Sequence, residues 1–284
     1  MKIIVGKYAG FCPGVKRAWA LVEKAAHKKN GPIFVLGELI HNRQAIQRIE
    51  SWGIKTIESL EEVKNGSGTL IIRAHGEPPK TFQKLAKIGL RVVDATCPSV
   101  ARVQKLAQKT ETQGYQVFVC GEKEHPEALA TIGYTKRGKI LSSPEEAAKK
   151  EEMEKVGVLS QTTFSPQTFT QICQILRGKC WVFKSLGTIC NFVQLAQKEG
   201  GQIAKKVDLV IVVGGKHSSN TKRLAEVCGK IVTTHHIETA SEIKKQWLNS
   251  AGKVGLLAGA STPEWIIEEV QKKLCSFGNC ALVS

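Results

Sequence analysis

The chain repeats one pattern three times, and this repeat constrains its fold more than any other feature. Cys12-Pro-Gly-Val recurs as Cys97-Pro-Ser-Val and, more loosely, as Cys190-Asn-Phe-Val, at intervals of 85 and 93 residues. A glycine lies 25, 24 and 24 residues past the respective cysteine, at Gly37, Gly121 and Gly214. Self-similarity at a long period is typical of folds built from repeated supersecondary units. The sequence therefore predicts three similar lobes.

Polar residues follow the glycines at two further places in each unit. The first set is His41, His125 and Ser218, and the second set is His75, Thr162 and Ser261. Each unit would thus offer one cysteine at the start of a helix and polar groups at two strand ends. We expect the units to pack about a pseudo-threefold axis at which the three thiols meet. The alternative is three unrelated loops that share no axis.

Short apolar runs alternate with amphipathic helical patterns along the whole chain. The runs occupy 3–5, 33–36, 70–72, 117–120, 156–159, 209–213 and 254–257. Strands with helices between them predict parallel α/β sheets, in which ligands collect at the carboxyl ends of the strands. The predicted lobes are 13–96, 97–187, and 188–284 together with an N-terminal strand in 1–12.

Composition limits the class of protein and the kind of partner. Hydrophobic residues make up 42% and charged residues 23%, as in ordinary globular proteins. Neither a long apolar span nor a leader pattern is evident, so we expect a cytoplasmic protein without a membrane partner. The net charge of +16 favours an acidic partner. Nucleic acid is disfavoured because aromatic residues make up only 6%, whereas an acidic electron donor would explain the charge.

The nine cysteines include no Cys-x-x-Cys pair, which disfavours zinc ribbons, thioredoxin-like motifs and compact ferredoxin patterns. A cysteine at a helix N-terminus is expected to have a lowered pKa, because the helix dipole favours the metal-binding thiolate. Structural zinc would need a fourth ligand, whereas three isolated cysteines suit a cubane cluster with one open iron. The sequence therefore predicts an iron-sulfur site at Cys12, Cys97 and Cys190.

The other six cysteines have ordinary interpretations. Cys120, Cys173 and Cys228 lie in apolar strand or helix patterns, where free cysteine is a common core residue. Cys180 is ambiguous. Cys275 and Cys280 lie near the C-terminus, and the sequence gives little indication of a metal or disulfide role for them.

Several polar residues are candidates for binding and proton transfer. Glu127 follows His125 and Pro126 at a helix start; it could merely complement the helix dipole, but at a strand end it could also donate a proton. An anion pocket is predicted because helix N-termini and imidazoles bind phosphate. Its residues would be His41, His75, His125, Ser218, Ser219, Asn220 and Ser261, the serines opening helices. His27, His217, His235 and His236 are interpreted as surface or structural.

A series of motifs resembles one known family over nearly the full chain. The motifs are GFCPGVKRA at 10–18, ELIHN at 38–42, RAHG at 73–76, DATCP at 94–98, HPE at 125–127, SQTTFS at 160–165, TIC at 188–190, HSSNTKRL at 217–224 and AGASTPEW at 258–265. In this order they resemble the 4-hydroxy-3-methylbut-2-enyl diphosphate reductases, called IspH or LytB.

The resemblance implies a three-lobed α/β trefoil around one [4Fe-4S] cluster per chain, with the cysteine ligands at Cys12, Cys97 and Cys190. Family members take two electrons, usually from ferredoxin or flavodoxin, and two protons, and form isopentenyl and dimethylallyl diphosphates. The diphosphate would be held by His41, His75, His125, Ser218, Ser219, Asn220 and Ser261. The catalytic residues implied are Glu127, Thr162 and His125.

Three positions, at two places in the chain, depart from the family pattern. Phe192 and Val193 stand where the family usually has Ala-Thr, and His217 stands where Asn is common. The alternative function is a non-catalytic iron-sulfur sensor or a basic nucleic-acid-binding protein on the same scaffold. Retention of Glu127 and Thr162 favours the enzyme, because a sensor has no need of a proton-transfer network.

Overall fold

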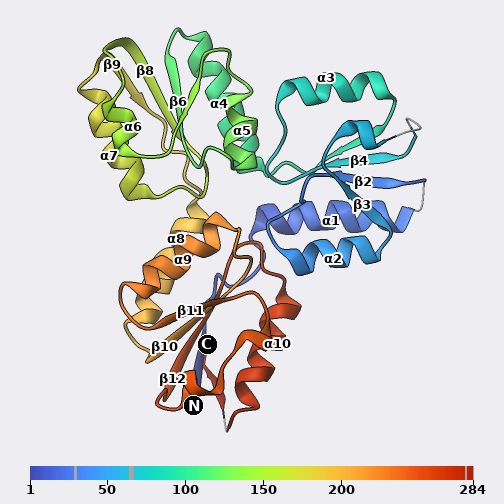
Figure 1. Cartoon of the computed structure of the whole chain (residues 1–284), viewed down its shortest axis with the longest axis vertical. Helices are drawn as coiled ribbons and strands as arrows, with labels where there is room; N and C mark the ends of the chain where they lie inside the picture. The colour runs from blue at the N-terminus through green and yellow to red at the C-terminus, as the bar shows by residue number, and fades with distance from the viewer. Residues whose placement is uncertain (29–30, 64–66, 279, 284) are drawn as a thin grey trace. The chain divides into compact units, whose positions relative to one another are not determined.

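The computed structural model describes residues 1–28, 31–63, 67–278 and 280–283. The chain forms two compact units, one of Met1–Lys16, His41–Gln47 and Asn191–Ser284, the other of Arg17–Ile40 and Arg48–Cys190. The described residues form three parallel sheets, and helices alternate with the strands along the chain (Figure 1). The predicted α/β class and the three similar lobes are confirmed. The exact lobe boundaries given above stay a prediction.

The three sheets share one strand order. The first is β3-β2-β4-β5, the second β7-β6-β8-β9, and the third β11-β10-β12-β1-β13. The strands are β1 (Lys2–Val5), β2 (Ile33–Leu36), β3 (Ile54–Ile57), β4 (Thr69–Ile72), β5 (Arg91–Asp94), β6 (Gln116–Cys120), β7 (Lys139–Leu141), β8 (Met153–Ser160), β9 (Cys180–Ser185), β10 (Leu209–Val213), β11 (Thr234–Ile237), β12 (Lys253–Ala258) and β13 (Ala281–Val283). All of their pairings are parallel.

Helices connect these strands, as expected for parallel neighbours. They are α1 (Pro13–Lys28), α2 (Arg43–Ser51), α3 (Pro79–Ile88), α4 (Pro98–Thr112), α5 (Pro126–Ile132), α6 (Pro144–Ala148), α7 (Pro166–Arg177), α8 (Asn191–Ala204), α9 (Ser219–Gly229) and α10 (Glu264–Cys275), with short 3-10 turns η1 (Leu60–Glu62), η2 (Ala240–Glu242) and η3 (Lys245–Leu248). None of the described helices is long and apolar enough to span a membrane.

The repeat is visible in the backbone hydrogen bonds that follow the first strand of each sheet. The N–H of Gly37 donates to the carbonyl of Ile57 at 2.7 Å. Gly121 makes the same bond to Leu141 at 3.0 Å, and Gly214 to Ile237 at 2.8 Å. In every case the acceptor is the last residue of the neighbouring strand. The three glycines therefore occupy equivalent positions, as their spacing predicted.

Strand β1 completes the third sheet with residues from the other end of the chain. It pairs with β12, from Lys2 with Lys253 to Val5 with Leu256. In the other sheets β5 pairs with β4 and β9 pairs with β8 in the same way. β1, β5 and β9 each lead into one of the cysteines Cys12, Cys97 and Cys190. β13 is an additional strand on the outer side of β1.

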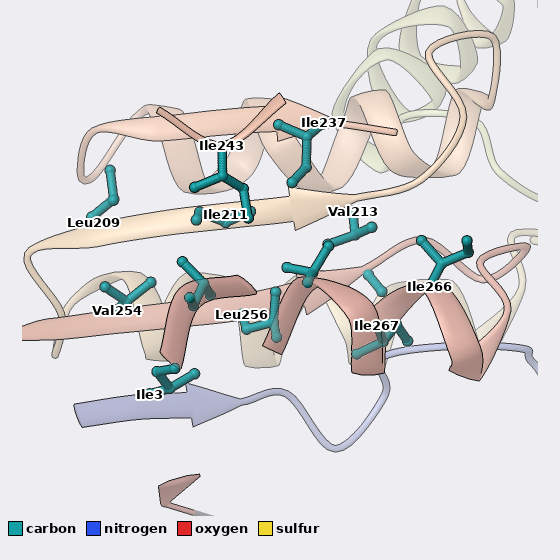
Figure 2. Close-up of a cluster of buried hydrophobic side chains, with 13 residues drawn as sticks. Ile3, Leu209, Ile211, Val213, Ile237, Ile243, Val254, Leu256, Ile266 and Ile267 are labelled. Atoms are coloured by element: carbon teal, nitrogen blue, oxygen red, sulfur yellow. The ribbon is translucent and has the colours of Figure 1, made fainter. Parts of the chain in front are cut away.

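Each central strand buries both of its faces, because helices cover the two sides of the sheet. In β10, Leu209, Ile211 and Val213 point toward α10 and belong to the cluster drawn in Figure 2. The intervening Val210 and Val212 pack against α8 and α9. The second sheet repeats this scheme, with α7 on one face and α4 on the other. Alternation of side chains in a strand explains the division.

All seven predicted strands are present, and six further strands were missed among the described residues. The six are β3, β5, β7, β9, β11 and β13, and every one lies at the edge of its sheet. Edge strands are partly exposed: in β9, Trp181 is 86% exposed and Val182 40%. Their residues do not form continuous apolar runs, which only strands buried on both faces require.

Truncating a side chain in the cluster of Figure 2 tests the core of the third sheet. Leu256 is fully buried, and Leu256→Ala should cost roughly 2–5 kcal/mol of unfolding free energy, because it leaves a cavity. Ile231→Ala removes a side chain that is 42% exposed and should cost less than about 1 kcal/mol. Urea unfolding can be followed by tryptophan fluorescence, since Trp247 and Trp265 pack against this cluster. Equal costs for the two variants would contradict the assignment.

Candidate active site

Each of the three repeat cysteines lies at the start of a helix. Cys12 immediately precedes α1, Cys97 is the N-cap of α4, and Cys190 immediately precedes α8. The N–H of Cys12 donates to the carbonyl of Ala260 at 3.0 Å. Cys97 donates to Ala74 at 2.9 Å, and Cys190 to Thr162 at 2.8 Å. One backbone hydrogen bond therefore fixes all three cysteine loops in the same way.

These hydrogen bonds also correct the register of the predicted repeat. Ala74, Thr162 and Ala260 each lie two residues beyond the end of a strand, namely β4, β8 and β12. Thr162 is therefore equivalent to Ala74 and Ala260. The predicted equivalence of Thr162 with His75 and Ser261 is wrong by one residue. The strands differ in length, so the number of residues from the cysteine does not give the exact alignment after the strand.

The three thiols differ from the buried cysteines Cys120 and Cys228 in their surroundings. Cys12, Cys97 and Cys190 are partly exposed and not disulfide-bonded, and the Val15 N–H points at the Cys12 Sγ at 3.4 Å. By contrast, burial raises the pKa of Cys120 and raises that of Cys228 to about 11. Metal ligation requires thiolates. An iron-sulfur group therefore fits the donor set that the three repeat cysteines offer, and it does not fit the buried thiols.

Cys275 and Cys280 form a disulfide with a Cα–Cα distance of 5.2 Å. It joins the end of α10 to the residue before β13. This disulfide was not predicted, because neither cysteine belongs to the repeat and the expected cytoplasmic location is one in which thiols are usually kept reduced. These two cysteines are not free ligands in this structure.

Glu127 and Thr162 form a buried hydrogen-bonded pair. The Thr162 N–H donates to Glu127 Oε1 at 2.6 Å, and the Thr162 hydroxyl donates to Oε2 at 2.8 Å. Glu127 is 2% exposed and Thr162 6%. Burial raises the pKa of Glu127 to about 7, although the hydrogen bonds from Thr162 oppose this shift. The carboxyl group can therefore hold a proton near neutral pH, and Thr162 connects it to the loop of Cys190.

His125 accepts a hydrogen bond from the backbone of Glu127 and lies beside a second histidine. It is the N-cap of α5, and its Nδ1 accepts the Glu127 N–H at 3.1 Å. The ring of His75 meets the ring of His125 edge to face, with centroids 5.3 Å apart. Glu127, His125, His75 and Thr162 therefore gather in one unit.

The loop at 215–220, called the serine loop below, lies in the other unit. Ser218 caps α9 by accepting the Thr221 N–H at 3.4 Å, and Ser219 and Asn220 form the first turn. All three side chains are buried, and Asn220 Oδ1 has no hydrogen-bond partner among the described residues. A buried acceptor or donor group without a partner is rare and suggests an absent ligand or water.

Ser261 approaches the same loop by a different route. Its hydroxyl donates to the carbonyl of His41 at 3.3 Å, and a Cβ added to Gly215 would lie 2.5 Å from that carbonyl oxygen. Only glycine therefore fits where the serine loop passes His41. The prediction that Ser261 opens a helix is wrong, because α10 begins at Glu264 with Pro263 as its N-cap.

The histidines interpreted as structural have structural contacts. His236 Nε2 lies 2.8 Å from the carbonyl of Gly214, and His235 stacks on Trp247 with ring centroids 3.7 Å apart. His217 is exposed within the serine loop. His27 Nδ1 lies 2.7 Å from the carbonyl of Glu23 on the exposed face of α1.

The predicted site residues form two groups, one in each compact unit. The first unit holds Cys12, His41, Ser218, Ser219, Asn220 and Ser261, and the second holds His75, Cys97, His125, Glu127, Thr162 and Cys190. Sequence reasoning missed the side chains that hold the cysteine loops. Thr188 is one of them: its hydroxyl accepts the Ser160 N–H and donates to the Ser160 carbonyl, both at 2.7 Å. Its place in the motif TIC was the available signal.

Comparison with known proteins gives one consistent result. The family model of the LytB protein matches residues 3–275. A 4-hydroxy-3-methylbut-2-enyl diphosphate reductase of Geobacter sulfurreducens is 42% identical over 284 residues, covering 98% of this chain and 99% of the relative. The enzyme of that name from Aquifex aeolicus is 39% identical over 289 residues, covering 99% of both chains.

Solved structures agree with this result. The E-1-hydroxy-2-methyl-but-2-enyl-4-diphosphate reductase from Plasmodium falciparum is similar with a TM-score of 0.92 and 28% identity, covering 99% of this chain and 91% of the other. A structure of (E)-4-hydroxy-3-methyl-but-2-enyl diphosphate reductase, the terminal enzyme of the non-mevalonate pathway, has a TM-score of 0.73 and 39% identity, covering 97% and 99%. With its motifs, its three sheets and nearly its whole length matched, the chain belongs to the LytB family.

Proposed function

We propose that this protein is an oxidoreductase that converts (E)-4-hydroxy-3-methylbut-2-enyl diphosphate to isopentenyl and dimethylallyl diphosphates, the last step of the non-mevalonate isoprenoid pathway. The observation that carries the proposal is the buried Glu127–Thr162 pair, a proton donor tied to the loop of Cys190. The names of the relatives support the choice of substrate. The reaction takes up two electrons and two protons, breaks the allylic C–O bond and releases water.

We infer that Cys12, Cys97 and Cys190 hold one [4Fe-4S] cluster per chain. The inference is supported by their equivalent positions at helix starts and by their partly exposed thiols, which form no disulfide. When bound, the cluster supplies the two electrons and an iron without a protein ligand that acts as a Lewis acid. The protein supplies the thiolates and the loops that hold them.

The diphosphate is assigned to the start of α9 and to the histidines. Free N–H groups at a helix N-terminus bind phosphate oxygens, and the dipole favours their negative charge. Ser218, Ser219, Asn220 and Ser261 add neutral donors, while His41, His75 and His125 add imidazole N–H groups. Asn220 Oδ1 is buried without a hydrogen-bond partner among the described residues, so its acceptor capacity is left for a donor group of a ligand or for a bridging water.

Glu127 is the proton source in this proposal. When protonated, it donates its O–H to the Thr162 hydroxyl oxygen, and the Thr162 hydroxyl is then free to donate to the departing substrate oxygen. One proton leaves in this way with the hydroxyl as water, and the other is added to carbon. Burial raises the pKa of Glu127 to about 7, so the dipole at the start of α5 does not keep it ionised.

The electron donor is proposed to be an acidic protein such as ferredoxin or flavodoxin. The net charge of +16 supports this class of partner, because complementary charge steers association. The proposal includes a cytoplasmic location and neither a nucleic-acid nor a membrane partner. A non-catalytic iron-sulfur sensor or nucleic-acid binder is the alternative, and no observation favours it.

One experiment decides between these functions. Protein purified without oxygen and reduced with viologen should turn over the hydroxylated diphosphate to the two isoprenoid products. Binding to random duplex DNA with a steep salt dependence, and no turnover, would instead support the alternative.

The cysteine assignment predicts three sensitive positions and one insensitive one. Cys12→Ser, Cys97→Ser and Cys190→Ser should each abolish the intact cluster, since each removes a thiolate ligand. Cys275→Ser is the control and should keep the wild-type iron content. Iron and sulfide analysis checks this, and Mössbauer spectroscopy adds the environment of each iron. Four irons with identical thiolate environments, or full iron in Cys97→Ser, would contradict the assignment.

The role of Glu127 predicts a loss of rate and a change in pH dependence. Glu127→Gln retains an acceptor for the Thr162 N–H but cannot donate the proton, so kcat should fall by about 10² to 10⁴ with unchanged iron. The wild-type rate should fall as the pH rises above about 7, because the protonated acid is the donor. The variant should lack this fall. Thr162→Ser is the conservative control. Near-normal turnover by iron-replete Glu127→Gln would rule out the role.

The diphosphate assignment predicts a change in affinity. A hydrogen bond to a charged oxygen contributes about 1.5–3 kcal/mol, so the double variant Ser218→Ala, Ser261→Ala should bind product diphosphate far more weakly. Ser276→Ala is the control, because its hydroxyl donates only to the Lys273 carbonyl in the last turn of α10. Calorimetric titration measures the difference. Unchanged affinity in the double variant would move the pocket elsewhere.

A further inference from the structure

A carboxylate on α8 holds the loop that carries Cys12. Glu199 Oε1 accepts the N–H of Lys7 at 2.9 Å, and Oε2 accepts the N–H of Tyr8 at 3.2 Å. Both donors lie between the end of β1 and Cys12. One side chain therefore satisfies two successive backbone N–H groups of this loop, and hydrogen bonds to a charged acceptor are the strong ones.

An aromatic contact on the same face of α8 also stabilises the loop that carries Cys12. Phe192 lies two turns before Glu199, so both side chains project from one side of the helix. The Phe192 ring meets the Tyr8 ring edge to face, with centroids 5.4 Å apart. The Phe192 ring therefore supplies an apolar contact to the Cys12 loop.

A guanidinium on α1 holds the loop that carries Cys97 in an analogous way. Arg17 donates to the carbonyl of Thr96 at 3.1 Å and to that of Asp94 at 3.3 Å. The Asp94 side chain accepts the Thr96 N–H at 2.9 Å and so closes the turn. Asp94 is the last residue of β5, and Thr96 immediately precedes Cys97. Arg17 belongs to the motif GFCPGVKRA, but the proposed reaction gives it no part.

Arg17 and Glu199 both project from a helix that begins at a repeat cysteine. α1 follows Cys12 and holds the loop of Cys97, whereas α8 follows Cys190 and holds the loop of Cys12. A helix that begins at one repeat cysteine therefore holds the loop that leads to another repeat cysteine. Neither Arg17 nor Glu199 is a ligand, and neither is among the residues assigned to the substrate.

We propose that Glu199 and Arg17 are positioning residues for the cysteine ligands: Glu199, with Phe192, sets how firmly the Cys12 loop retains its metal, and Arg17 does so for the Cys97 loop. The proposal rests on the cluster assignment in the proposed function. A loop that opens presents its thiolate to water and to chelators. Each residue should therefore limit the opening of its own loop and leave the other loop unchanged. Opening of either loop should speed loss of iron from the shared cluster.

Amide hydrogen exchange of the metal-free, reduced protein tests the loops directly. Glu199→Ala should speed exchange in 6–12 by about tenfold, which corresponds to about 1.4 kcal/mol, and leave 94–97 unchanged. Arg17→Ala should do the reverse. Lys198→Ala and Lys16→Ala alter exposed neighbours on the same helices and should change neither loop. A variant that is merely destabilised would speed exchange in both loops and would overturn the proposal.

Iron loss from the cluster-loaded protein tests the consequence. Transfer of iron to a ferrous chelator should be about tenfold faster in Glu199→Ala and Arg17→Ala than in the wild type. Glu199→Gln keeps one acceptor and should lie between, and Phe192→Ala should show a smaller increase. Equal rates in all variants would overturn the proposal even if the wild type turns over normally. A wild type that binds no iron would instead overturn the proposed function, while the exchange pattern would still decide whether the two loops are held independently.

Discussion

The hydrogen bond that each repeat cysteine donates through its backbone N–H orders the rest of the site. It joins the residue at a helix start to the carbonyl two positions beyond a strand, and it occurs at Cys12, Cys97 and Cys190 alike. Because the acceptor loops are the ones that also carry His75, Thr162 and Ser261, the same bond sets the metal-binding thiol and the polar residues in a fixed relation. Thr162 combines both tasks, since its carbonyl holds Cys190 while its N–H and hydroxyl hold Glu127.

Glu127 shows how burial can override a helix dipole. A carboxylate in the first turn of a helix is ordinarily stabilised as the anion. In this protein, burial nevertheless raises the pKa of Glu127 to about 7. The two hydrogen bonds from Thr162 act against this rise and keep it moderate. The Glu127 carboxyl group can therefore donate a proton near neutral pH without any ligand bound.

Much of the fold could be predicted from the sequence, and the errors have physical causes. The strands buried on both faces, such as β10, read as continuous apolar runs, whereas edge strands such as β9 did not. The three glycines and the three cysteines were placed correctly relative to the strands and helices, because their spacing repeats in each unit. Thr162 was misaligned by one residue and Ser261 was wrongly placed at a helix start, since loop lengths after a strand leave no periodic signal. The side chains that hold the loops, Thr188 and Glu199, act through backbone groups that no sequence pattern displays.

The position of β1 has a consequence for how the molecule is made. Synthesis proceeds from the N-terminus, so Ala74 exists before Cys97 and Thr162 before Cys190, and these loops find their partners in segments already made. Cys12 is the first of the three to emerge from the ribosome, but its partner Ala260 is made after the partners of the other two, and β1 cannot pair with β12 until β12 has been made. During synthesis, the loops of Cys97 and Cys190 can therefore form their backbone hydrogen bonds before the loop of Cys12 can.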